Sequence, residues 1–257
     1  MPDDQPAEPC HRDALVQAAN DLLQPARFKD YGPNGLQVEG KPQVRRLVSG
    51  VTASLALIDA AIEQGADAIL VHHGLFWRGQ DGRVTGWMKQ RLSRLLAHDI
   101  NLLAYHLPLD AHPECGNNAQ LALKLGIGVQ GSFGEQDLGL WGESPTPDPD
   151  AFIAQARQLF GREPVVVRPD PQRPWRRVGW CSGGAQGYFE AAIAAGVDAF
   201  ITGEISEPQA HLARETAVAF LACGHHATER WGAPAVAARL ARELGMQHQF
   251  IDIPNPA

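Results

Sequence analysis

The sequence predicts an α/β protein built from two similar lobes. Three observations support this prediction: short apolar segments alternate with amphipathic ones, some apolar segments are continuous, and one strand–helix–strand unit occurs twice. Continuous apolar strands are typical of parallel sheets that helices cover on both faces. The 257 residues are enough for one large domain or two modest ones.

The individual elements follow from apolar spacing and from turn residues. Helices are predicted over 13–23, 54–64, 89–98, 117–125 and 148–160, with a final helix that begins near residue 225. Strands are predicted over 47–51, 68–71, 100–105, 164–168 and 218–222, and residues 126–143 are predicted to be β-rich. Pro234 falls in the final helix, where proline is tolerated only in the first turn.

An internal repeat relates the two lobes without gaps. It aligns Arg45-Arg46 with Arg176-Arg177, Ala60-Ala61-Ile62 with Ala191-Ala192-Ile193, Gly65 with Gly196, and Asp67-Ala68 with Asp198-Ala199. The alternative is that any two strand–helix–strand units share glycine caps and alanine-rich helices. We predict a first lobe over 1–125, a second over 126–222, and a C-terminal segment over 223–257 that packs back on the first lobe.

Composition excludes several classes of protein. A net charge of −7 disfavours a protein that mainly binds nucleic acid, because phosphate contacts need a basic surface. The acidic, proline-rich start lacks the pattern of a secretory signal, and no apolar run reaches the ~18 residues of a membrane span. Four scattered cysteines form no CxxC pair, so a disulfide framework or thiolate zinc site is not expected. We therefore expect a cytoplasmic protein.

Residues of metal-binding type follow three predicted strands. His72 and His73 follow the strand over 68–71, Asp110 follows the strand over 100–105, and His225 with Glu229 follows the strand over 218–222. Ligands of open α/β sheets bind beyond the carboxyl ends of the strands. Each segment alone has a simpler explanation: a surface histidine pair, a polar loop, or a glutamate paired with Arg230 or Arg239.

Together these five side chains predict a metal site. His225 and Glu229 stand at i and i+4, a spacing that stacks both on one helical face. Imidazole and carboxylate ligands suit zinc, iron or manganese, and five ligands exceed what one catalytic zinc takes. We therefore predict two divalent ions in one pocket. The glycine-rich turn over 181–187 either cradles a phosphate or carboxylate or is a plain strand-to-helix turn.

The chain resembles the NIF-three-like (YbgI-like) dinuclear-metal proteins, often labelled "GTP cyclohydrolase I type 2 homolog". The matching segments are Asn34-Gly-Leu-Gln-Val38, Ala68-Ile-Leu-Val-His-His-Gly74, His106-Leu-Pro-Leu-Asp110, Ile201-Thr-Gly-Glu204 and Gly224-His-His-Ala-Thr-Glu-Arg230. The resemblance implies interlinked α/β lobes with mixed sheets flanked by helices. It places the metal ligands on His72, His73, Asp110, His225 and Glu229, and it places His106 and Glu204 in the same pocket. It also implies a ring-shaped homo-hexamer, a trimer of dimers.

Two functions remain open at this stage. The leading hypothesis is a metal-dependent hydrolase of a small molecule, with His106 or Glu204 moving the proton and a nucleotide suggested as substrate by the family label. The alternative is a non-catalytic metal-binding hexamer that acts as a scaffold or regulatory interaction protein. Binding of nucleic acid through the ring is the least favoured reading.

Overall fold

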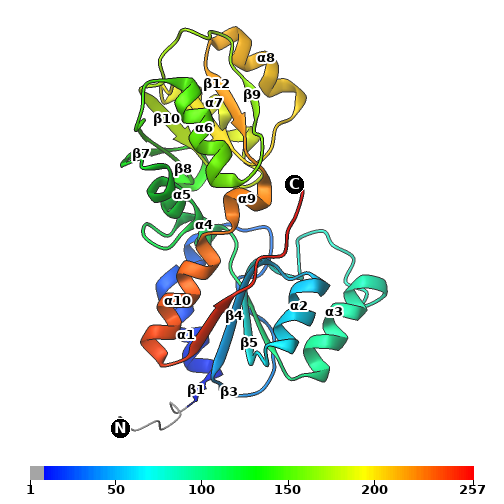
Figure 1. Ribbon diagram of the computed structural model, residues 1–257. Coiled ribbons are helices and arrows are strands. Elements are labelled where there is room, and N and C mark those ends of the chain that lie inside the picture. Colours follow the sequence, from blue (N-terminus) through cyan, green and yellow to red (C-terminus); the bar gives the residue numbers. More distant parts are fainter. Residues whose placement is uncertain (1–8) are drawn as a thin grey trace. The chain divides into compact units, whose positions relative to one another are not determined.

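The chain forms two compact units, and the computed structural model describes residues 9–257 (Figure 1). Unit 1 comprises the residues up to Leu109 and Gly232–Ile253, and unit 2 comprises Asp110–Trp231 and Pro254–Ala257. The chain therefore passes between the units three times, which makes them interlinked. The first eight residues, on which the expected absence of a secretory signal rests, lie outside the described part.

Unit 1 is a mixed five-stranded sheet in the order β13-β4-β5-β6-β2, in which only β2 is antiparallel to its neighbour. Helices α2 and α3 lie on one side of this sheet, and α1 and α10 lie on the other (Figure 1). The strands of this sheet are β2 (Gly35–Val38), β4 (Arg46–Thr52), β5 (Ala68–His73), β6 (Asn101–Ala104) and β13 (Gln247–Phe250), and β1 (Cys10–His11) pairs with β3 (Gln43–Val44) in a separate two-stranded sheet. The helices are α1 (Arg12–Leu23), α2 (Leu55–Glu63), α3 (Gly86–Ala97) and α10 (Gly232–Leu244), with a short 3-10 helix over Pro25–Arg27.

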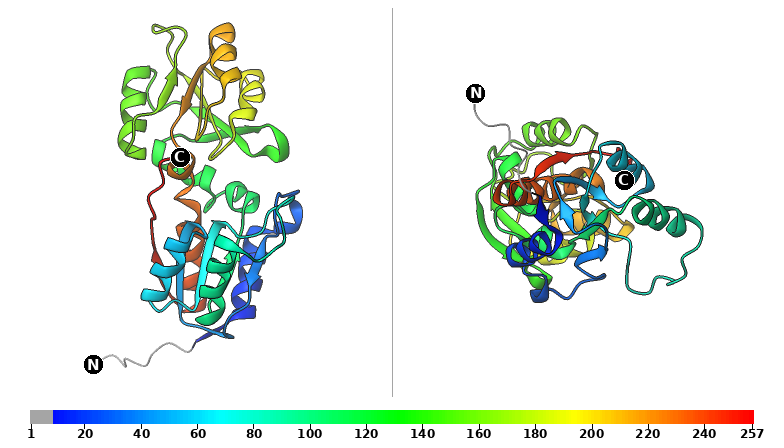
Figure 2. Two further views of the ribbon diagram at one scale, coloured as in Figure 1. Left: turned by 90° about the vertical axis from the view of Figure 1, so that its right-hand side faces the viewer. Right: turned by 90° about the horizontal axis from the view of Figure 1, so that it is seen from below.

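Unit 2 is a mixed six-stranded sheet in the order β7-β8-β10-β11-β12-β9, with a parallel centre formed by β10, β11 and β12. Helix α6 lies on one side of this sheet, and α7 and α8 lie on the other (Figure 2, left). The strands are β7 (Val129–Phe133), β8 (Gly139–Glu143), β9 (Val165–Val167), β10 (Arg177–Trp180), β11 (Ala199–Thr202) and β12 (Ala219–Ala222). The helices are α5 (Asn117–Leu125), α6 (Pro149–Phe160), α7 (Phe189–Ala194), α8 (Glu207–Thr216) and α9 (His225–Glu229), and 3-10 turns cover Glu135–Asp137 and Gln186–Tyr188. Helix α4 (Leu107–Ala111) contains the first passage between the units.

The repeated strands of the two units share one topology, as the sequence repeat predicts. The parallel strands β4, β5 and β6 of unit 1 correspond to β10, β11 and β12 of unit 2, and each set is flanked on one edge by an antiparallel strand that precedes it in sequence: β2 in unit 1 and β9 in unit 2. Asp67 Oδ2 accepts hydrogen bonds from the backbone N–H groups of Arg45 and Arg46 at 2.7 and 2.9 Å. Asp198 Oδ2 accepts the corresponding pair at 2.9 and 3.0 Å. A strand–helix–strand unit does not require this shared carboxylate, so the match favours duplication.

The ranges of the units differ from those expected in two places. Residues 110–125 belong to unit 2, because Leu121 and Leu125 of α5 pack into the core of that unit with Phe152 and Trp180. Residues 223–231 also belong to unit 2, while α10 and β13 join unit 1. The predicted final helix is two helices, α9 and α10, and Pro234 lies in the first turn of α10, where its missing N–H breaks no helical hydrogen bond.

Across residues 9–257, every helix is too short or too polar to cross a membrane.

The repeated aspartates provide a test of the fold. Burial alone would raise the pKa of Asp67 and Asp198, but hydrogen bonds from Lys41, Arg173 and the backbone outweigh it and lower the pKa of both. Asp67→Ala or Asp198→Ala should each lower the free energy of unfolding in urea by about 1–3 kcal/mol at neutral pH, because two N–H donors lose a charged acceptor.

The exposed Glu215→Ala serves as the control, with an expected change within about 0.5 kcal/mol. Because the pKa of each aspartate is lower in the folded state, the stabilisation that it provides is fully present above the ordinary carboxyl pKa of 3.8. This stabilisation is lost as the pH falls through the pKa of the folded state. The loss of unfolding free energy in both variants should therefore become smaller in acid. If either aspartate variant loses no more unfolding free energy at pH 7 than Glu215→Ala, the stabilising role assigned to that aspartate is contradicted.

Candidate metal centre

His72 and His73 end the central strand of unit 1, and their rings lie close together. The ring centroids are 4.5 Å apart, although neighbouring side chains in a regular strand point to opposite faces. The chain leaves the strand at Gly74, where a side chain would collide with the amide of Gln37 at 2.3 Å. Gln37 Oε1 accepts the N–H of Leu75 at 2.8 Å and so holds the turn in place.

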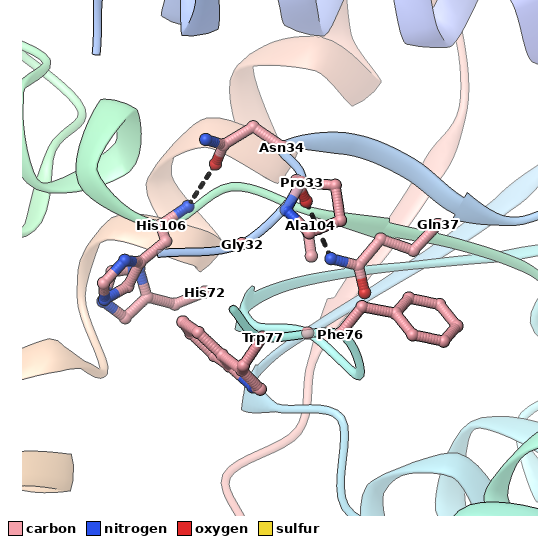
Figure 3. A pocket seen from close by; sticks show the side chains of 10 residues that line it. Gly32, Pro33, Asn34, Gln37, His72, Phe76, Trp77, Ala104 and His106 are labelled. Carbon is pink, nitrogen blue, oxygen red and sulfur yellow. Dashed lines mark hydrogen bonds between the residues drawn. The ribbon is translucent and has the colours of Figure 1, made fainter. Parts of the chain in front are cut away.

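His106 follows the adjacent strand β6 and joins this pair. Its ring centroid lies 5.0 Å from that of His72 and 5.7 Å from that of His73. One ring nitrogen from each of the three lies within 4.8 Å of the others, a spacing that allows them to hold one metal ion. We call His72, His73 and His106 the imidazole cluster; Figure 3 shows two of its members beside Trp77.

A hydrogen bond engages Nδ1 of every member of the imidazole cluster. His72 Nδ1 lies 3.1 Å from the carbonyl oxygen of Tyr105, and His106 Nδ1 lies 2.7 Å from Oδ1 of Asp30. His73 Nδ1 lies 3.1 Å from Oγ1 of Thr52. Histidine ligands of metals are oriented in this way by a partner on the other nitrogen. The arrangement leaves Nε2 of each ring as the ligand atom.

Asp30 is a residue that the sequence did not point out. Its side chain is only 4% exposed, and it accepts hydrogen bonds from Asn34 and from the backbone of Tyr31 and Leu107 as well as from His106. Burial alone would raise the pKa of Asp30, but these donors, led by His106, lower it to about 2. Asp30 therefore stays ionised and fixes the orientation of His106.

His225 and Glu229 lie on helix α9 of unit 2 with the predicted i, i+4 spacing. His225 Nε2 is 3.1 Å from Oε2 of Glu229, and the Glu229 side chain is 4% exposed. Two ligands of one zinc ion, each at ~2.0–2.1 Å, lie roughly 3–3.5 Å apart. The pair is therefore already spaced as two ligands of one ion would be.

Glu204 follows β11 and contacts His225 on its other nitrogen. Oε1 of Glu204 lies 2.6 Å from Nδ1 of His225, and Oε2 accepts a hydrogen bond from Gln186 at 3.2 Å. The bond to Glu229 is the largest influence on His225; with the bond to Glu204 it outweighs burial and raises the pKa of His225 to about 9. The proton-transfer role of Glu204 stays a prediction, and its contact with Nδ1 of His225 is also compatible with orienting that imidazole.

Asp110 is buried in unit 2 and is held by two neutral donors. Oδ1 of Asp110 accepts hydrogen bonds from Asn117 Nδ2 at 2.9 Å and from Ser182 Oγ at 3.1 Å. A carboxylate oxygen of Asp110 lies within 4.8 Å of one from Glu229. We call Asp110, His225 and Glu229 the carboxylate cluster.

The glycine-rich turn over 181–187 packs against the carboxylate cluster. A Cβ at Gly183 would lie 1.9 Å from Oε1 of Glu229, and Gly183 has a φ of +67°, which side chains rarely adopt. The Gly183 N–H donates to Oγ1 of Thr228 at 2.9 Å. A Cβ at Gly203 would lie 2.6 Å from Cα of His225. These two glycines therefore leave the space that α9 and its two candidate ligands occupy.

The residues present fit a metal ion and do not fit thiol chemistry. Neutral imidazoles and carboxylates are the donors that zinc, iron and manganese accept. Burial raises the pKa of the Cys181 thiol and raises that of the Cys223 thiol to about 12. Neither is therefore available as a thiolate nucleophile near neutral pH. The part of the chain that the structure describes thus offers groups able to hold a metal ion at the ends of its strands.

Comparison with known proteins identifies the family of the chain. A model of the family described as Duf34/NIF3 (NGG1p interacting factor 3) matches residues 10–256. The chain belongs to this family. It is 54% identical over 247 residues to a Pseudomonas aeruginosa protein named "GTP cyclohydrolase 1 type 2 homolog". The aligned region covers 95% of this chain and 97% of the relative.

Solved structures of relatives share the fold. A structure described as protein ybgI, of unknown function, is 49% identical in sequence and has a TM-score of 0.93. The superposition covers 96% of this chain and 100% of the ybgI chain. A Thermus thermophilus protein is 35% identical with the same coverage and has a TM-score of 0.87. The NIF3 fold and the α/β class with mixed sheets are thereby confirmed.

Gly183 provides a test of the candidate metal centre. Gly183→Ala should lower metal affinity at least tenfold, because the methyl group would displace the carboxylate of Glu229, and it should cost about 1 kcal/mol of stability through its positive φ. Isothermal titration with Zn²⁺ and urea unfolding measure the two effects.

Gly187→Ala is the matched control in the same turn, because nothing lies within 4 Å of its Cβ position and its φ is ordinary. Equal zinc affinities for the two alanine variants would contradict the role assigned to Gly183.

Proposed function

We propose that the chain is a metal-dependent hydrolase of the NIF3 family that holds two divalent ions, with ligands from the imidazole cluster and the carboxylate cluster. The observation that carries this proposal is the set of oriented histidines, each with Nδ1 engaged by a defined partner. Such partners accompany metal-binding histidines and raise their basicity. Zinc, iron and manganese are the ions that these donors favour.

We propose that His106 is a metal ligand and does not act as the base that moves the proton. Its Nδ1 faces the buried carboxylate of Asp30, and its ring lies with the two other imidazoles of the cluster. Three imidazoles are a common set for a catalytic zinc ion, which keeps a further position for water or substrate. Glu204 keeps a proton on Nδ1 of His225, so that Nε2 can serve as the ligand atom.

When bound, a pair of divalent ions supplies Lewis acidity that acidifies water and polarises a carbonyl or phosphoryl group. The residues of the chain position those ions and exclude competing chemistry. The name of the Pseudomonas aeruginosa relative makes GTP the first substrate to assay. Phosphoesters and amides follow, because the ligand set suits many hydrolyses.

Elemental analysis and anomalous scattering test the metal content. The purified chain, loaded with Zn²⁺ or Mn²⁺, should contain two ions per chain. Glu229→Ala should lose at least one ion, and Glu204→Gln should weaken binding about 10- to 100-fold, the range typical of residues that orient a ligand.

Glu207→Ala, which removes a highly exposed carboxylate on α8, is the control and should retain both ions. Full metal occupancy in Glu229→Ala would refute the ligand assignment. A fully loaded protein without turnover on any of these substrates would instead favour the non-catalytic metal-binding scaffold.

We further propose that the protein is a cytoplasmic homo-hexamer. The family resemblance supports the ring, and the absence of paired cysteine motifs supports a reducing compartment. Light scattering of the purified protein should give a mass about six times the chain mass of 27.8 kDa. A monomer or dimer at micromolar concentration would refute the hexamer.

A further inference from the structure

An open hollow of about 300 Å³ lies beside the imidazole cluster in unit 1. Residues 30–33 line it on one side, and Phe76, Trp77 and Arg78 line it on the other. Gly32, Pro33, Phe76 and Trp77 also line the narrow pocket that contains His72 and His106. Figure 3 shows the Trp77 indole next to these imidazoles. The hollow and the narrow pocket therefore share a wall.

The walls of this hollow are aromatic. The Tyr31 side chain is 58% exposed, and Trp77 is half-buried. The ring centroids of Trp77 and His106 are 5.1 Å apart at 88°, and those of Tyr31 and His106 are 6.0 Å apart. Exposed aromatic rings stack on planar ligands, and each such contact is worth ~1–3 kcal/mol for a nucleobase. Tyr31 and Trp77 are therefore suited to hold a flat ring.

Backbone contacts join the two sides of the hollow before any ligand arrives. The N–H of Arg78 donates to the carbonyl of Tyr31 at 2.6 Å, and the Arg78 guanidinium donates to the carbonyl of Asp30 at 2.6 Å. Gly32 packs so closely that a side chain there would lie 2.4 Å from the carbonyl oxygen of Phe76. A preformed site loses less conformational freedom on binding, so its contacts contribute more fully to affinity.

The charge around the hollow favours an anion. Arg78 is exposed at its rim. The only other charged lining residue is Asp30, whose carboxylate is buried and accepts hydrogen bonds from four groups of unit 1. Arginine presents planar donors that match carboxylate and phosphate oxygens.

We infer that this hollow binds a planar heteroaromatic ring that carries an anionic group, with the ring against Tyr31 and Trp77 and the anion on Arg78. The inference names the substrate class of the proposed hydrolase and so rests on the proposed function, because the ring would lie next to the ligands of the metal.

Isothermal titration of the full-length chain with adenosine 5′-monophosphate, adenosine and ribose 5-phosphate tests this inference. Metal-free and zinc-loaded protein are titrated separately, so that binding is measured independently of turnover. The nucleotide should bind with a dissociation constant below ~1 mM in both forms. It should bind more tightly than adenosine, which lacks the anion, and than ribose 5-phosphate, which lacks the ring.

Variants assign the two contacts. Trp77→Leu should weaken nucleotide binding about 5- to 100-fold, and Trp77→Phe should restore most of it, because the phenyl ring still stacks. Arg78→Gln should weaken nucleotide binding about tenfold and weaken adenosine binding less, because only the nucleotide carries the anion. Trp87→Leu and Arg91→Gln are the matched controls: this tryptophan–arginine pair, 4.8 Å apart on α3 and with Trp87 exposed, lies outside the hollow and should leave affinity unchanged.

Three results would overturn the inference: no saturable binding of the nucleotide, equal binding of ribose 5-phosphate, or unchanged affinity in Trp77→Leu. Each is distinct from failure of the proposed function. If hydrolysis is unaffected by substitution of Trp77 and Arg78, the ligand site in the hollow is refuted but the hydrolase is not. If nucleotide binding requires both residues but no substrate is hydrolysed, the hydrolase is refuted and the binding site still stands.

Discussion

The hydrogen bond on Nδ1 of each candidate histidine ligand is the interaction on which the rest of the site depends. A freely rotating imidazole offers either nitrogen in many directions, whereas an engaged Nδ1 leaves one nitrogen in one direction. The partners are the carbonyl of Tyr105 for His72, Thr52 for His73, Asp30 for His106 and Glu204 for His225. Three of these partners stand at or just beyond the carboxyl end of a parallel strand. The α/β sheet of each unit therefore supplies both the ligands and the groups that orient them.

The internal repeat accounts for why both units can do this, and the differences between its two copies account for why they do it differently. His72 and His73 of unit 1 align with Gly203 and Glu204 of unit 2. In unit 2 the backbone of His225 passes 2.6 Å from where a side chain of residue 203 would begin, so only glycine fits there. The same strand end thus provides a candidate ligand in one copy and the space for a candidate ligand in the other. At the other end of the strands the two copies are alike, because Asp67 and Asp198 accept the same pair of backbone hydrogen bonds.

Local pattern was enough to predict the α/β class, most elements and the pairing of His225 with Glu229. The continuous apolar segments became the central parallel strands, and the i, i+4 spacing brought two side chains to 3.1 Å. Asp30 escaped prediction because its partner His106 lies 76 residues away, and no local period records such a contact. The role of Gly183 is hidden for the same reason: the carboxylate that it accommodates comes from residue 229. The break between α9 and α10 was signalled only by Pro234, which marks the first turn of the second helix.

The charges of the carboxylate cluster explain why unit 2 is suited to a cation. Asp110 and Glu229 are 7% and 3% exposed, and a carboxylate oxygen of one lies within 4.8 Å of one of the other. Two like charges at this distance, removed from water, destabilise the fold unless a positive charge compensates. With its pKa raised to about 9, His225 carries that charge as a proton near neutral pH in the absence of metal. A divalent ion brings more positive charge to the same atoms and displaces the proton, so that ion binding and the stability of unit 2 are linked through the same two carboxylates.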